Sequence, residues 1–171
     1  MTVKVLVMGV SGCGKSTVAA RLASALGARL IEGDDFHLPA SQRKMRDGIP
    51  LDDSDRWPWL DRLGALLAAD TGSAVLSCSA LKRAYRDRLR AAVPDLRIVY
   101  IEIAPEEARS RVAARTGHLL PPSLVANQFA TLEPPVGESN VLFVAAAQPL
   151  EAQVGAAIDW LGHLMSMASA T

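Results

Sequence analysis

The stretch Val3-Lys4-Val5-Leu6-Val7-Met8-Gly9-Val10-Ser11-Gly12-Cys13-Gly14-Lys15-Ser16-Thr17 decides the fold of this chain. Residues 9–16 match the pattern G-x-x-x-x-G-K-[ST], and they follow an apolar, β-branched run that is typical of a buried strand. In that context glycines let backbone N–H groups surround phosphate oxygens, and the next helix adds the positive end of its dipole. The stretch therefore predicts a nucleoside triphosphate site, with phosphates bound by Gly9, Val10, Ser11, Gly12, Cys13, Gly14, Lys15, Ser16 and Thr17.

Two side chains of this loop have predicted chemical roles. Lys15 is expected to reach the β- and γ-phosphates and to act in catalysis, while the Ser16 hydroxyl is expected to bind Mg²⁺. The alternative is a chance glycine-rich turn between a strand and a helix. The complete motif, followed by good helix-forming residues, disfavours that alternative. Because Cys13 lies among amides near a helix N-terminus, we also expect its thiol to have thiolate character and to be sensitive to oxidation.

Composition limits the class of protein. The chain has 171 residues and 50% hydrophobic content, which fits one compact domain over residues 1–171. Its 18 Lys and Arg balance 18 Asp and Glu, so its net charge favours neither nucleic acid nor an anionic membrane. The longest strictly apolar run, residues 141–147, is far too short to cross a bilayer, and residues 1–10 lack a secretory cleavage pattern. We therefore expect a cytoplasmic protein whose two cysteines are reduced.

Short β-type runs alternate with longer helical ones along the chain. This alternation predicts βαβ units, and hence an α/β fold with a parallel sheet. The expected strands are residues 3–8, 29–31, 74–78, 97–102 and 141–144, and the expected helices are residues 15–26, 55–69, 81–93, 105–115, 122–132 and 150–165. Asp53 or Ser54 is expected to cap the second helix. Residues 35–54 and 115–122 look irregular, and such connections form the ligand crevice of an open parallel sheet.

Carboxylates follow the second predicted strand. Glu32 and Asp34 are two residues apart, so they are expected on the same side of an extended chain, beside the phosphates. We expect Glu32 to hold Mg²⁺, directly or through water, and Asp34 to take the proton from an attacking hydroxyl. The alternative for both is an Asx turn or a helix cap. No Asp ends the third strand, so the metal depends on Ser16 and this pair, or on water. His37 is expected to donate to a substrate oxygen, or else to be a satisfied polar group.

Two groups of cations complete the expected site. Lys82, Arg83 and Arg86 lie at a predicted helix start, where positive charge opposes the dipole and calls for an anion such as a substrate carboxylate; the alternative is a solvated basic face. Residues 111–122 are expected to form a lid that carries Arg111 and Arg115 to the transferring phosphoryl group as catalytic residues. The alternative is that these arginines are surface charges on an amphipathic helix.

Longer motifs resemble one family, the small phosphate-loop gluconate kinases within the shikimate and nucleoside monophosphate kinase group. They are M-G-V-S-G-C-G-K-S-T at 8–17, E-G-D-D-F-H at 32–37, Lys44-Met45, Gly48 to Leu51, D-D-S-D-R-W-P-W-L at 52–60, C-S-A-L-K-R-A-Y-R-D at 78–87, Gly117-His118 and Q-F-A-T-L-E-P-P at 128–135. One departure is Leu38, inserted between His37 and Pro39, which loosens the expected substrate-side turn.

The resemblance implies a phosphate-loop NTPase fold of the nucleoside monophosphate kinase type, with a five-stranded parallel sheet between helices and a mobile lid. It implies ATP as donor, D-gluconate as acceptor at its 6-hydroxyl, and a homodimer. It also implies a substrate-side insertion at about residues 35–60. The substrate-binding residues that it implies are Asp34, His37, Lys44, Arg56, Ser79, Lys82, Arg86, His118 and Gln128.

Two other functions stay open at this point. A kinase for another small hydroxy acid, such as shikimate, would use the same anionic anchors and carboxylate base. A regulatory nucleotide-binding protein would also carry the phosphate loop. That reading is less favoured, because neither Asn127 nor Asn140 lies in an N-K-x-D guanine-binding motif.

Overall fold

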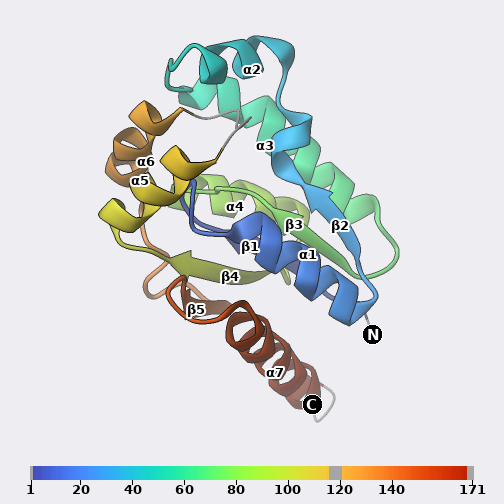
Figure 1. Ribbon diagram of the computed structural model, residues 1–171. Helices are drawn as coiled ribbons and strands as arrows, with labels where there is room; N and C mark the ends of the chain where they lie inside the picture. Colours follow the sequence, from blue (N-terminus) through green and yellow to red (C-terminus); the bar gives the residue numbers. More distant parts are fainter. Residues whose placement is uncertain (1, 116–120, 169–171) are drawn as a thin grey trace.

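A parallel sheet of five strands lies at the centre of the structure, a computed structural model that describes residues 2–115 and 121–168 (Figure 1). The strands are β1 (Lys4–Met8), β2 (Arg29–Glu32), β3 (Ala74–Ser77), β4 (Arg97–Glu102) and β5 (Val141–Ala145). Their order in the sheet is β2-β3-β1-β4-β5. In the register Val7 pairs with Ser77, and Ser77 pairs with Glu32, so the carboxyl ends of β1, β2 and β3 meet at one edge. The predicted α/β fold with a five-stranded parallel sheet is confirmed.

Helices cover both faces of the sheet, so its central strands β1, β3 and β4 are buried on both sides. On β1, Val5 and Val7 enter one apolar core with α1, α5, α6 and α7, whereas Leu6 and Met8 enter a second core with α3 and α4. This alternation follows from the period of two in an extended strand. The helices are α1 (Lys15–Leu26), α2 (Pro39–Arg46), α3 (Asp53–Ala69), α4 (Arg83–Ala92), α5 (Pro105–Ala114), α6 (Val125–Thr131) and α7 (Leu150–Ala168), with 3-10 helices η1 (Gly33–Phe36) and η2 (Pro122–Leu124).

Local sequence explains where α1 and α3 begin and end. Gly14 and Gly27 flank α1 in the left-handed conformation, with φ of 92° and 58°, and the Gly27 N–H bonds back to the Ser24 carbonyl. Helix α3 begins with a capping box, in which the Asp52 carboxylate accepts from the Asp55 N–H and the Asp55 carboxylate accepts from the Asp52 N–H. The predicted cap at Asp53 or Ser54 is therefore wrong by one or two residues, because only Asp52 has the reciprocal partner three positions later.

Helix α2 was not predicted from the sequence, which suggested an irregular segment at residues 35–54. The helix has Pro39 at its first turn, and its short apolar face is completed by Met45, which packs against Leu124 of η2. That contact joins segments far apart in the chain. Figure 1 shows α2 above the sheet, on the same side as η1 and the start of α3. Within the described ranges, no helix is long and apolar enough to cross a membrane.

Candidate functional site

One pocket opens above the carboxyl ends of β1, β2 and β3, where α2 and α6 approach it from either side. Its lining combines the phosphate loop with five other segments of the chain. The lining residues are Ser11, Lys15, Asp34, His37, Met45, Pro50, Leu51, Arg56, Trp59, Ser79, Leu124, Asn127 and Gln128. A wider hollow continues from it past Pro50, Leu51, Arg56 and Asn127 to Asp53 and Lys82. We call the first the acceptor pocket and the second its outer extension.

The phosphate loop is in the expected place between β1 and α1, and α6 contacts it directly. The Gln128 side-chain oxygen accepts a hydrogen bond of 2.6 Å from the Ser11 N–H. On the other side of the loop a separate hollow is lined by Cys13, Gly14, Thr17, Val18, Arg111 and Arg115, together with the turn from β5 to α7. Lys15 therefore lines the acceptor pocket, whereas the predicted lid arginines line a separate hollow beside the loop.

The lid prediction is covered only in part by the described residues. Arg111 donates to the Ala146 carbonyl at 3.2 Å and forms an ion pair with Glu107, so α5 is held against the turn after β5. His118 and the middle of the predicted lid lie outside the described residues.

Three residues with side-chain oxygens lie on the first turn of α1 and at the carboxyl ends of β2 and β3. The Ser16 and Ser77 hydroxyl oxygens are 3.3 Å apart, and Glu32 pairs with Ser77 in the register. One oxygen of Glu32 is buried and has no hydrogen-bond partner among the described residues. A buried carboxylate oxygen without a donor is costly, and a hard cation with oxygen ligands would satisfy it. These residues therefore fit the predicted Mg²⁺ site, and Ser77 stands where the sequence lacks the usual Asp.

Asp34 reaches the acceptor pocket by a different route from the one predicted. The chain does not stay extended after Glu32 but turns into η1, so the argument from a spacing of two residues is wrong. The indole N–H of buried Trp59 holds this turn through a 2.8 Å hydrogen bond to the Gly33 carbonyl. Gly33 is required there, because a Cβ would lie 2.5 Å from the Ser77 carbonyl oxygen. Packing of η1 on β3 and α3 therefore places Asp34 in the lining together with Lys15.

His37 is buried beside Asp34. Its ring stacks on Trp59, with centroids 4.1 Å apart, and its Nε2 atom lies 3.6 Å from the Asp34 carboxylate. Among the described residues, the buried Nδ1 atom has no hydrogen-bond partner. His37 is therefore not the fully satisfied polar group that the sequence left open, and it lies in the lining of the acceptor pocket.

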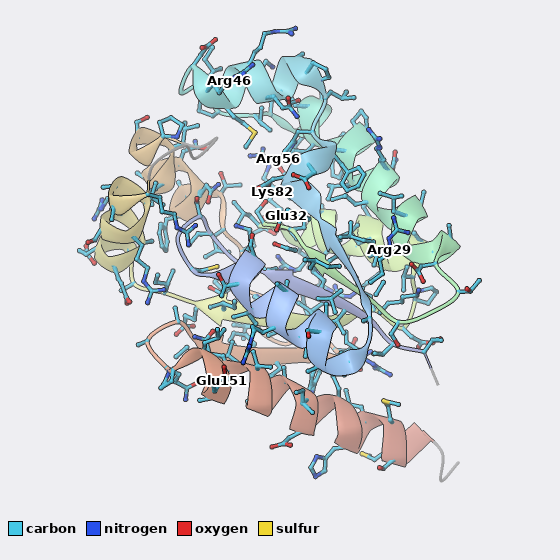
Figure 2. The ribbon with its side chains drawn as sticks, turned by 45° about the vertical axis from the view of Figure 1, so that its right-hand side comes forward. Arg29, Glu32, Arg46, Arg56, Lys82 and Glu151 are labelled. Atoms are coloured by element: carbon cyan, nitrogen blue, oxygen red, sulfur yellow. The ribbon has the colours of Figure 1, made fainter. Side chains whose placement is uncertain are left out.

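Carboxylates hold two of the predicted substrate-binding cations, Lys82 in the lining of the outer extension and Lys44 outside that lining. Lys82 forms a 3.0 Å ion pair with Asp53, and Lys44 forms one of 2.8 Å with Asp55. Hydrogen bonds from Tyr85 and Lys82 hold the pKa of Asp53 below its ordinary value. In Figure 2 the labelled Arg56 and Lys82 lie between the sheet and α2, where both line the extension.

Arg56 is anchored from behind. Its guanidinium donates to the Leu51 carbonyl and, at 3.3 Å, to the Tyr85 hydroxyl. Sequence reasoning missed the supporting partners Asp53 and Tyr85, because their roles depend on the contact between the starts of α3 and α4.

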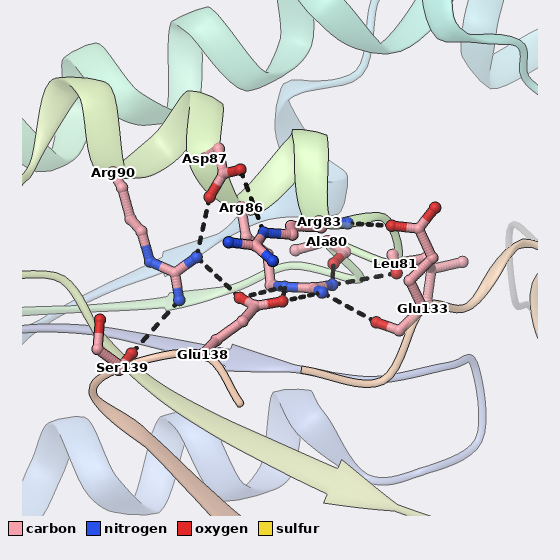
Figure 3. A network of polar contacts seen from close by, with 9 residues as sticks. All are labelled: Ala80, Leu81, Arg83, Arg86, Asp87, Arg90, Glu133, Glu138 and Ser139. Atoms are coloured by element: carbon pink, nitrogen blue, oxygen red, sulfur yellow. Dashed lines mark hydrogen bonds and ion pairs between the residues drawn. The ribbon is translucent and has the colours of Figure 1, made fainter. Parts of the chain in front are cut away.

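The predicted role of Arg86 in substrate binding is wrong. Its side chain is fully buried, and its guanidinium donates to Glu138 and to the carbonyls of Ala80, Leu81 and Glu133 (Figure 3). A guanidinium enclosed in this way has no face open to the acceptor pocket. The sequence placed it near Lys82 on one helix turn, but the helix directs it inward.

The expected thiolate character of Cys13 is also wrong. Cys13 is buried, and burial raises the pKa of its thiol despite the nearby Lys15 ammonium. Burial likewise raises the pKa of Cys78 to about 12. Both cysteines are free thiols, as expected.

Comparison with known proteins adds an independent finding. A family described as "AAA domain" matches residues 5–135. A gluconokinase of Gluconobacter oxydans is 46% identical over 144 residues, which cover 82% of this chain and 80% of the relative. The thermoresistant gluconokinase of Escherichia coli is 42% identical, with 90% of each chain covered. A crystal structure of a gluconokinase from Sinorhizobium meliloti superposes with a TM-score of 0.89 at 45% identity, covering 98% of this chain and 95% of that one.

Proposed function

The chain belongs to the gluconokinase family, and we propose that it transfers the γ-phosphoryl group of ATP to the 6-hydroxyl of D-gluconate, giving 6-phospho-D-gluconate. The observation that carries the proposal is the acceptor pocket, which Lys15 lines together with Asp34 and Arg56. A phosphate-binding cation, a proton acceptor and an anchor for an anionic substrate thus share one hollow. This combination suits transfer to the alcohol of a small hydroxy acid.

Asp34 is the proposed base. Phosphoryl transfer needs little covalent chemistry from the protein, so its main contributions are to align the acceptor and to remove its proton. Asp34 would accept that proton while the Lys15 ammonium balances negative charge on the donor phosphates. His37 lines the acceptor pocket and is proposed to bind a hydroxyl of the acceptor. His37 would then fix the substrate as well as the carboxylate beside it.

The carboxylate of the substrate is proposed to bind at Arg56 and Lys82. Both cations line the outer extension, which is continuous with the acceptor pocket. Lys44, also proposed for the substrate, is held by Asp55 and would act at the rim. Ser79 and Gln128 line the acceptor pocket and would contact the polyol chain.

The metal and the lid complete the proposal. Ser16 and Glu32 would hold Mg²⁺, which when bound neutralises charge on the phosphate oxygens. Arg111 and Arg115 line the far side of the phosphate loop and are proposed to serve a lid over about residues 111–122. We also propose a cytoplasmic homodimer, whose assembly light scattering after size exclusion will test.

The activity test is an ADP-release assay with Mg²⁺-ATP and three acceptors: D-gluconate, shikimate and AMP. We expect turnover with gluconate alone. Turnover with shikimate instead would favour the alternative hydroxy-acid kinase, and ADP release at the same rate with and without any acceptor would refute the kinase assignment.

The base is tested by Asp34→Asn. This substitution keeps the size of the side chain but removes the proton acceptor, so kcat should fall by about 100-fold or more while ATP still binds. Asp35→Asn is the matched control, because Asp35 lies next to it in η1 but is exposed. An unchanged kcat in Asp34→Asn would assign the base to another group.

A further inference from the structure

Arg86 and Glu138 form a buried ion pair that no predicted role explains. Arg86 is 0% exposed and the Glu138 side chain is 5% exposed. The guanidinium donates through Nε to both carboxylate oxygens of Glu138, at 3.2 and 3.1 Å, and Arg90 donates to Glu138 at 2.8 Å. The buried Glu138 carboxylate therefore accepts hydrogen bonds from two arginines, which offset the cost of burying its charge.

The same guanidinium joins two stretches of backbone that are distant in sequence. It donates to the Ala80 carbonyl at 2.9 Å, to the Leu81 carbonyl at 3.1 Å and to the Glu133 carbonyl at 2.9 Å. Figure 3 shows these contacts converging on Arg86. We call Arg86, Glu138 and these three carbonyl groups the Arg86 clamp. A planar group with five donors can satisfy such a set, and a lysine cannot.

Glu133 is attached to the other stretch by two more bonds. Its N–H donates to the Leu81 carbonyl at 2.8 Å, and its carboxylate accepts from the Arg83 N–H, the first of α4, at 2.7 Å. Ala80 adopts φ of 43°, a left-handed conformation that is costly for alanine and persists where surrounding contacts enforce it. These bonds hold Glu133, just after α6, against the turn between β3 and α4.

Both joined stretches lead directly into the acceptor pocket. Ser79 precedes the clamped carbonyls and lines the pocket. On the other side, the Leu132 N–H bonds to the Gln128 carbonyl at the end of α6, and the Gln128 side chain bonds to Ser11 of the phosphate loop. The Arg86 clamp therefore contacts the chain next to Ser79 in the pocket lining. It also contacts the chain just after α6, the helix whose Gln128 binds the phosphate loop.

We propose that Arg86 and Glu138 are positioning residues for phosphoryl transfer. They hold the turn that carries Ser79 and helix α6 at the separation that aligns the substrate hydroxyl with the γ-phosphate of ATP. The inference rests on the proposed function. Replacing a buried ion pair by apolar residues of similar size is often harmless to stability, but here the replacement also removes a donor from three carbonyl groups. Effects on folding and on positioning therefore have to be measured separately. Phosphoryl transfer is sensitive to small displacements, since about 1 Å of misplacement costs about 100-fold.

The test separates positioning from folding. The variants are the double substitution Arg86→Met with Glu138→Leu, the single substitution Glu138→Gln, and the control Arg88→Met. Arg88 lies on the same helix, but its ion pair with Asp61 is exposed. For each protein we would measure thermal unfolding, ADP affinity, kcat and KM for gluconate, and the ADP released per 6-phosphogluconate formed.

We expect the double variant to unfold cooperatively and to bind ADP within about twofold of wild type, since ADP needs only the phosphate loop. Its kcat/KM for gluconate should fall by roughly 10- to 100-fold, with ADP release in excess of product as water replaces the misaligned alcohol. Glu138→Gln should show a smaller loss of the same kind, and Arg88→Met none.

The inference would be overturned if the double variant folded, kept the wild-type kcat/KM and released one ADP for each 6-phosphogluconate formed. So would parallel losses of ADP affinity and kcat/KM in both variants, which indicate general destabilisation. Should the double variant not fold, Glu138→Gln decides by the same two criteria. The proposed function is tested separately by wild type: if it phosphorylates a different hydroxy acid, gluconate fails as the substrate, and the variants are compared on that acid.

Discussion

Trp59→Phe is the substitution whose consequences follow most directly from the structure. Trp59 is 2% exposed, its indole N–H bonds to the Gly33 carbonyl at 2.8 Å, and its ring stacks on His37. Phenylalanine keeps an aromatic ring at this position but removes the donor. The buried carbonyl at the start of η1 then loses the donor that ties it to α3, next to the residue that bears the proposed base.

The expected cost in stability comes from two terms. Loss of one buried hydrogen bond costs about 0.5–1.5 kcal/mol, and incomplete packing of the smaller ring adds about 1 kcal/mol. The free energy of unfolding should therefore fall by about 1.5–2.5 kcal/mol. For a chain of this size each kcal/mol shifts Tm by roughly 2–4 °C, so Tm should fall by roughly 3–10 °C. Because η1 loses its fixed point, kcat for gluconate should fall by about tenfold.

Urea unfolding and steady-state kinetics measure these two effects. Trp57→Phe is the matched control, since Trp57 is only partly buried and packs edge-on against Tyr85. We expect its loss of stability to be under about 1 kcal/mol, with kcat unchanged. If Trp59→Phe kept the wild-type Tm and kcat, or if both substitutions had equal effects, the inference that Trp59 fixes the turn bearing Asp34 would be refuted.

Three further outcomes are expected. Native protein at pH 7.5 should leave Cys13 and Cys78 unmodified by a thiol reagent, because burial raises the pKa of both, while both react in denaturant; fast labelling of Cys13 in the native state would contradict this. Burial alone would raise the pKa of Glu138, but hydrogen bonds from Arg86 and Arg90 outweigh it and hold the pKa below the ordinary value of 4.5. The stability that Glu138 contributes is then fully present above about pH 4.5 and is lost as the pH falls through the lowered pKa. The urea midpoints of wild type and Glu138→Gln should therefore converge in acid. A constant difference between the two midpoints at every pH would contradict this. Asp52→Ala should lower the free energy of unfolding by about 1 kcal/mol through loss of the capping box, measured by urea unfolding, with Ser54→Ala as the weaker control.

The phosphate loop was predictable because its conformation is local. Gly9, Gly12 and Gly14 all have positive φ, which glycine adopts at little cost, and the following helix needs no distant contact to begin. The same holds for the helix from Lys15 to Leu26 and for the strand from Arg97 to Glu102, whose bounds were predicted without error. In these segments the spacing of apolar residues and the residues that mark the ends of the element indicate the same bounds.

The acceptor side was predicted less well. Residues 39–46 have a weak apolar pattern that becomes a helix face only when Met45 meets Leu124. Asp34 was expected in the pocket for the wrong reason, since its position comes from Trp59 and from the close approach of Gly33 to β3. Arg86 was assigned to a ligand because a sequence does not show which cations face inward.

By itself, the sequence determined the phosphate loop, the parallel sheet and the family, because each is indicated by patterns of residues that are neighbours along the chain. Only the tertiary structure decided which charges meet a substrate and which are enclosed. Lys82 and Arg86 lie four residues apart on one helix turn, yet Lys82 lines a hollow and Arg86 is buried against Glu138. The difference lies in the packing of α4 against the segment that contains Glu138, about 50 residues later in the chain. This packing encloses and satisfies Arg86, whereas Lys82 stays in the lining of the outer extension.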